Sequence, residues 1–131
     1  MHRLLEHTAD LRAELTGADF GALCGEAVAL LRELLVGDCR VEPREERRVA
    51  LAGPDEAERF FRFVRELVYW ADTDGFLPAA CAKEDGAVSV RGERFDASRH
   101  AVDRQIKALT RHHFVFERTA GGLRAELIFD L

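Results

Sequence analysis

The sequence predicts a single compact α+β domain, residues 1–131, in which two amphipathic helices cover a largely antiparallel or mixed β-sheet. The length suits one domain, and no linker or repeat interrupts it. Two long segments, 20–35 and 54–74, carry apolar residues at three- and four-residue spacing, which is typical of helices. Most of the remaining chain consists of short segments that alternate apolar and polar residues, so the element order favours an α+β class.

The first strand is expected at residues 11–16, where leucine and alanine alternate with polar residues, so that one face is buried. The first helix follows, with Asp19 as a suitable N-cap and Gly37 at its end. Residues 41–53 predict a strand interrupted by an exposed, charged turn. The second helix is expected to begin with Pro54 at its first position and to end at Gly75.

The last part of the chain predicts only strands. The Asp85-Gly86 pair separates two apolar segments and indicates a hairpin turn. Further strands are expected at 101–110, 113–119 and 123–131, with a loop at 96–100. Adjacent residues on a strand point to opposite faces, so His112 and His113 are interpreted as turn residues that form no facing pair.

Charge and composition exclude several classes of protein. The net charge of −5 disfavours a free-standing nucleic-acid binder, so no direct DNA contact is expected. The three cysteines lack C-x-x-C spacing, which disfavours a disulfide framework, and reduced thiols suit a cytoplasmic protein. Cys24 fits the apolar face of the first helix as a small buried residue. No apolar run approaches the roughly 20 residues that span a bilayer, so no membrane partner is expected.

Two carboxylates stand at the ends of predicted strands. Asp10 precedes the first strand, and Asp130 ends the last, followed by Leu131 and its α-carboxylate. If the two strands are neighbours in the sheet, these oxygens form a site that suits a hard cation such as calcium or magnesium. The alternative is a pair of unrelated surface aspartates.

Three further residues are candidates for a supporting role, each with a simpler interpretation. His7 could be a ligand or an acid–base group, although lone histidines are more often exposed or hydrogen-bonded. Lys107 lies in a predicted strand, where a lysine usually faces solvent. Glu66 lies among apolar residues of the second helix and is most simply a boundary residue. No nucleophile–base pair stands out by its spacing.

Together the motifs resemble the archease family. The matching stretches cover nearly the whole chain in order: residues 6–10 (EHTAD), 41–46 (VEPREE), 64–77 (VRELVYWADTDGFL), 91–110 (RGERFDASRHAVDRQIKALT) and 127–131 (LIFDL). The resemblance implies a compact α+β domain that is not itself an enzyme. It further implies a cofactor of the RtcB-type RNA ligase, promoting guanylylation of the ligase histidine and multiple turnover in tRNA splicing and RNA repair. GTP and tRNA would then be contacted only through the ligase.

The resemblance also assigns residues. It implies a metal site at Asp10, Asp130 and Leu131, holding a calcium-like ion, with manganese or magnesium as alternatives. Lys107 matches a functionally important lysine of the family, and Glu66 matches an acidic position. Arg12 and Arg111 depart from the family pattern. Two other functions stay open: a chaperone-like adaptor for RNA-processing proteins, and a small metal-dependent phosphoester hydrolase.

Overall fold

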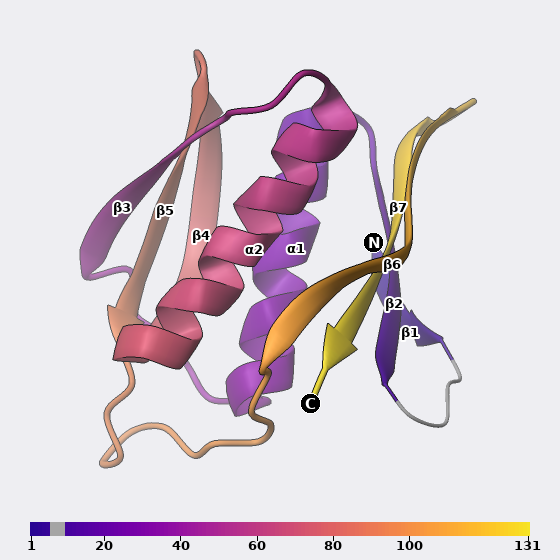
Figure 1. Ribbon diagram of the computed structural model, residues 1–131. Helices are drawn as coiled ribbons and strands as arrows, with labels where there is room; N and C mark the ends of the chain where they lie inside the picture. Colours follow the sequence, from indigo (N-terminus) through magenta and orange to yellow (C-terminus); the bar gives the residue numbers. More distant parts are fainter. Residues whose placement is uncertain (6–9) are drawn as a thin grey trace.

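The computed structural model describes residues 1–5 and 10–131, and it has three layers, with two helices between two antiparallel sheets (Figure 1). Sheet A has the strand order β1-β2-β7-β6, formed by β1 (His2–Leu5), β2 (Leu11–Gly17), β7 (Gly122–Asp130) and β6 (Ala108–Thr119). Sheet B has the order β3-β5-β4, formed by β3 (Glu45–Ala50), β5 (Ala87–Arg94) and β4 (Phe76–Glu84). The predicted α+β class is confirmed. The division of the strands into two sheets was not predicted.

Helix α1 (Phe20–Val36) begins and ends as the sequence predicts. The Asp19 side chain accepts a hydrogen bond from Ala22 N at 2.8 Å, and Gly37 ends the helix with φ 61°. The buried residues of α1 are Phe20, Leu23, Cys24, Ala27, Val28, Leu30, Leu31, Leu34, Leu35 and Val36. They cover most of the helix circumference because α1 packs against strands of both sheets.

Helix α2 (Glu56–Asp74) begins two residues later than predicted. Its N-cap is Asp55, whose side chain accepts a hydrogen bond from Glu58 N at 2.8 Å. Pro54 therefore precedes the cap, and its predicted place at the first helical position is wrong. Gly75 ends the helix in the left-handed conformation, with φ 69°.

Sheet B contains the predicted hairpin. Strands β4 and β5 pair across Asp85 and Gly86, and Gly86 has φ 71°, as such a turn requires. A second glycine is required inside β5, because a Cβ at Gly92 would lie 1.9 Å from the Leu77 carbonyl oxygen. This close approach brings the two strands together beside the Phe76 ring.

Strand β6 replaces the two strands that were predicted at residues 101–110 and 113–119. Residues 101–107 form no strand, and β6 runs continuously from Ala108 to Thr119 with an irregular register between Thr110 and Val115. His112 and His113 lie inside this irregularity, where His113 has φ 57°. Their ring centroids are 4.0 Å apart, so the expectation that they form no facing pair is wrong. The extra residues of the bulge remove the strict alternation of faces.

The thiols of Cys24, which is buried, and Cys81, which is half-buried, suit a packing role. Cys24 is fully buried, as predicted, and burial raises the pKa of its thiol far above the ordinary value. Burial raises the pKa of Cys81 to about 11. Both groups stay protonated near neutral pH and behave as small apolar side chains. Neither of the two described helices is long and apolar enough to cross a membrane.

Candidate functional site

Strands β2 and β7 bring the start of β2 and the C-terminal residues together. They pair antiparallel in a register that places Leu11 opposite Phe129. Asp10 directly precedes the first paired residue of β2, and Asp130 directly follows the partner of that residue on β7, so both lie at the same end of this strand pair. Figure 1 shows the start of β2 and the end of β7 at the same lower edge of sheet A. The strand pairing that the metal hypothesis requires is therefore present in the backbone.

Lys107 reaches the same edge from the other side. Its backbone N–H donates to the Asp130 carbonyl oxygen at 2.8 Å, and Ala108 then pairs with Asp130 as β6 begins. The Lys107 side chain is exposed. Asp130 thus ends β7, which lies between β2 and β6. Asp10 precedes β2 on one side of it, and Lys107 precedes β6 on the other side.

The remaining candidates have different positions. His7 lies outside the described residues. Leu131 follows Asp130 and is 47% exposed. Glu66 is half-buried on α2, and within the described chain it makes no hydrogen bond or ion pair with Asp130 or Lys107. The backbone of Asp10, Asp130, Leu131 and Lys107 therefore lies at one end of the strands of sheet A, whereas Glu66 lies on α2.

The donor chemistry at this edge fits a hard divalent cation. Asp10 and Asp130 contribute carboxylate oxygens, which calcium and magnesium prefer over nitrogen or sulfur. Across residues 1–5 and 10–131, no three carboxylate, imidazole or thiol side chains converge on one point. A cation held here would complete its coordination with backbone oxygens, water or groups from a partner.

Next to this edge, the outer face of sheet A carries a ladder of ion pairs. Arg12 Nε donates to Glu126 Oε1 at 3.0 Å, and this contact holds the Glu126 pKa below its ordinary value. Arg124 binds the second Glu126 oxygen and also donates to Glu14 at 2.7 Å. Arg3 donates to Glu14 at 2.8 Å, the main cause of a lowered Glu14 pKa. Opposite charges two residues apart on neighbouring strands are the signal that predicts such a ladder once the register is known.

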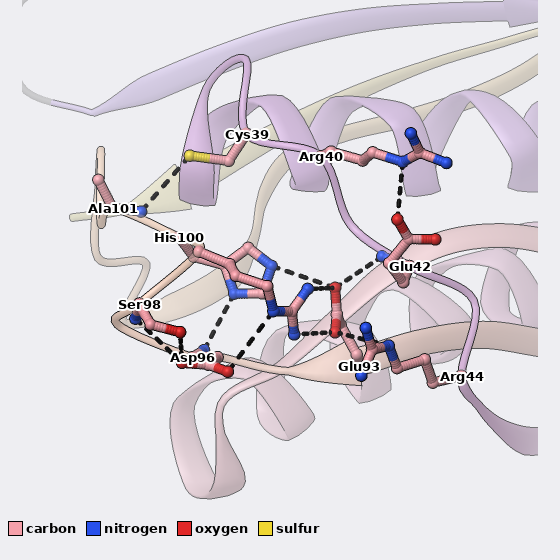
Figure 2. Close-up of polar contacts among 10 residues, drawn as sticks. Cys39, Arg40, Glu42, Arg44, Glu93, Asp96, Ser98, His100 and Ala101 are labelled. Atoms are coloured by element: carbon pink, nitrogen blue, oxygen red, sulfur yellow. Dashed lines mark hydrogen bonds and ion pairs between the residues drawn. The ribbon is translucent and has the colours of Figure 1, made fainter.

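A buried polar cluster lies at the start of the segment that leads to Lys107 (Figure 2). The Glu93 carboxylate accepts a hydrogen bond from Glu42 N at 2.6 Å and binds the Arg99 guanidinium through two nitrogens. These contacts, chiefly that of Arg99, lower the Glu93 pKa to about 2. The buried carboxylate is therefore ionised and paired.

The His100 side chain is fully buried, and it links the Glu93 carboxylate to the backbone of Asp96. Its Nδ1 accepts a hydrogen bond from Asp96 N at 2.9 Å. Its Nε2 lies 3.2 Å from Glu93 Oε2. Because Nδ1 is the acceptor, the ring proton is on Nε2, which donates to Glu93.

The segment 95–107 is attached along its length although it has no regular structure. Phe95 N donates to the Gly75 carbonyl at 2.7 Å, and Asp103 N donates to the Leu35 carbonyl at 2.8 Å. Ile106 is buried in the core. These contacts, together with the hydrogen bond of Lys107 N, fix the position of the Lys107 backbone at the end of the segment.

Sequence reasoning missed this cluster. Glu93 stands in an alternating strand pattern, where a charged residue is normally assigned to solvent. Arg99 and His100 stand in a stretch assigned to a loop. A glutamate followed within seven residues by an arginine and a histidine was the available signal, and alone it does not indicate burial.

Comparison with known proteins gives a consistent result. The profile of the Archease protein family matches residues 2–131. The archeases of Methanopyrus kandleri and Pyrococcus furiosus are each 31% identical to this chain. The alignments cover 97% and 96% of this chain, and 96% and 95% of the relatives. The Methanosarcina mazei archease is 27% identical, and its alignment covers 99% of this chain and 95% of that protein.

Two solved structures share the fold. One is the crystal structure of an archease from Thermotoga maritima, described as a possible chaperone, with 25% identity and a TM-score of 0.70. It covers all of this chain, which in turn covers 98% of it. The other is the solution structure of a Methanobacterium thermoautotrophicum protein, with 24% identity, a TM-score of 0.78 and coverage of 99% and 98%. With a family profile that matches almost the whole chain and relatives aligned over nearly their full length, this protein belongs to the archease family.

Proposed function

We propose that this protein activates an RtcB-type RNA ligase by presenting the lower edge of sheet A to the nucleotide site of the ligase. Activation means faster guanylylation of the ligase histidine and repeated turnover in tRNA splicing and RNA repair. Membership of the archease family supports the proposal. The observation that supports it is the β2–β7 register, in which Leu11 faces Phe129, together with the hydrogen bond from Lys107 N to the Asp130 carbonyl oxygen.

Each residue of the edge has a distinct role in the proposal. Asp10, Asp130 and Leu131 would hold a divalent cation, which would offset phosphate charge when bound. The Lys107 side chain is exposed, so its ammonium group can contact a triphosphate oxygen in the ligase. The protein performs no bond-forming step itself. GTP and tRNA are contacted through the ligase.

The direct test is single-turnover guanylylation of the cognate ligase with and without this protein. Asp10→Ala and Asp130→Ala are each expected to abolish stimulation because each removes a carboxylate from the edge. Asp72→Ala is the matched control, since Asp72 is an exposed aspartate on α2, and it should stimulate like the wild type. Full stimulation by both edge variants would exclude the proposal.

A chaperone-like adaptor is the second candidate, because the Thermotoga maritima relative is described as a possible chaperone. An adaptor would bind its partner through a surface rather than through charge at one edge. Tyr69, 58% exposed on α2, is the large exposed ring on such a surface. In that case Tyr69→Ala would abolish stimulation, while the two aspartate variants would retain it.

A further inference from the structure

The outer face of sheet A is arranged as successive pairs of facing residues. Arg12 and Glu14 share this face of β2, because alternate residues of a strand share a face, and Asp10 directly precedes the strand. Opposite Arg12 and Glu14 on β7 lie Ile128 and Glu126, and Asp130 is the next residue of β7 on this face. Arg12 therefore stands between two acidic pairs, one at the edge of the sheet and one further along it.

The Arg12 guanidinium turns away from the edge and binds Glu126. Its Nε donates to Glu126 Oε1 at 3.0 Å, and its Nη2 donates to the same oxygen. The Glu126 side chain is 9% exposed, against 37% for Arg12, so the carboxylate is the fixed partner. Arg124 binds the second Glu126 oxygen and thereby holds the carboxylate in place.

The direction of Arg12 matters for any cation at the edge. Residues two apart on a strand lie about 7 Å from each other, a distance that an arginine side chain can span. A guanidinium turned toward Asp10 and Asp130 would repel a divalent cation and compete for the same carboxylate oxygens. Glu126 provides the alternative partner on the other side.

We infer that Glu126 is a positioning residue that holds Arg12 away from Asp10 and Asp130, and thereby sets the affinity of this edge for a divalent cation. The inference rests on the cation site of the proposed function. It concerns the protein alone and requires no ligase. It also gives a role to the contact between Arg12 and Glu126.

The test is isothermal titration of the full-length protein with Ca²⁺, repeated with Mn²⁺ and Mg²⁺. Glu126→Gln should weaken cation binding at least about fivefold, because the released guanidinium adds a positive charge beside the site. Arg12→Gln should bind at least as tightly as the wild type. The double variant Arg12→Gln/Glu126→Gln should return to within about twofold of Arg12→Gln, since no guanidinium remains to be released.

Glu14→Gln is the matched control. Glu14 lies opposite Glu126 in the same ladder, but it binds Arg3 and Arg124 rather than Arg12. Its loss should leave cation affinity within about twofold of the wild type. If Glu126 only supported the fold, the double variant would bind as weakly as Glu126→Gln, and the rescue would be absent.

The possible outcomes separate the two proposals. Binding that is lost in Asp10→Ala but unchanged in Glu126→Gln would overturn the role of Glu126 and leave the cation site in place. A double variant as weak as Glu126→Gln would also overturn it. A wild-type protein that binds none of the three cations would overturn the cation site, and the role of Glu126 with it.

Discussion

At the scale of single residues, Glu93 shows how burial changes the role of a charged side chain. It lies in a strand pattern that assigns it to solvent, yet its side chain is 5% exposed. The carboxylate is tolerated there because Arg99, His100 and the Glu42 backbone N–H occupy its oxygens. These partners come from two stretches of chain, one of them about fifty residues before Glu93, so sequence alone could not predict them.

Glu93→Gln is expected to lower the free energy of unfolding by about 2 kcal/mol. The change removes a buried charge and leaves the Arg99 guanidinium, which is partly exposed, without its partner. Glu84→Gln is the control, because Glu84 pairs with Arg48 on the surface and should cost less than about 1 kcal/mol. Urea unfolding measures both, and equal stability losses would contradict the assigned role.

The same residue predicts a pH dependence. The folded-state pKa of Glu93 is about 2 and its ordinary value is 4.5, so its contribution to stability is present above pH 4.5 and is lost as pH falls toward 2. The stability difference between the wild type and Glu93→Gln should therefore shrink across that range. Thermal unfolding at successive pH values measures this difference. A gap that stayed constant down to pH 2 would contradict the lowered pKa.

At the scale of elements, the segment 95–107 was the main failure of sequence reasoning. Its second half alternates apolar and polar residues and so predicts a strand. In the structure its backbone groups bind elsewhere, to the last turn of α1 through Leu35 O and to β7 through Asp130 O. The last carbonyl groups of α1 have no partner within the helix, and Asp103 N donates to one of them. The alternation of apolar and polar residues near Asp103 cannot predict a contact with a residue so distant in the sequence.

The contact between His100 and Asp96 N predicts how this segment responds to mutation. His100→Ala removes the acceptor for Asp96 N and the donor to Glu93. Amide hydrogen exchange at Asp96 and Asp103 should accelerate at least about tenfold, while exchange in β7 stays slow. His112→Ala, at an exposed position on β6, should leave these rates unchanged. Unaltered exchange at both amides in His100→Ala would show that the cluster does not hold the segment.

At the scale of the whole molecule, features set by neighbouring residues could be predicted from the sequence, whereas features set by long-range pairing could not. The caps at Asp19 and Gly37, the end of α2 and the Asp85-Gly86 turn depend on neighbouring residues, and the sequence predicts them correctly. The two-sheet division, strand β1 and the bulge in β6 depend on pairings between distant residues, and they were missed. The candidate site lies between these cases. Its residues were predicted, but the β2–β7 register that joins them could be read only from the structure.

The most direct measurement of the central claim is nuclear magnetic resonance of the protein during titration with Mn²⁺, whose unpaired electrons broaden nearby amide signals. We expect the signals of Leu11, Lys107 and Asp130 to broaden together, at one Mn²⁺ concentration, while those of β3 are unaffected. Asp130→Ala should remove the effect at all three residues. Broadening at Leu11 without Asp130, at Asp130 without Leu11, or on sheet B would contradict the claim that Asp10 and Asp130 form a single cation site.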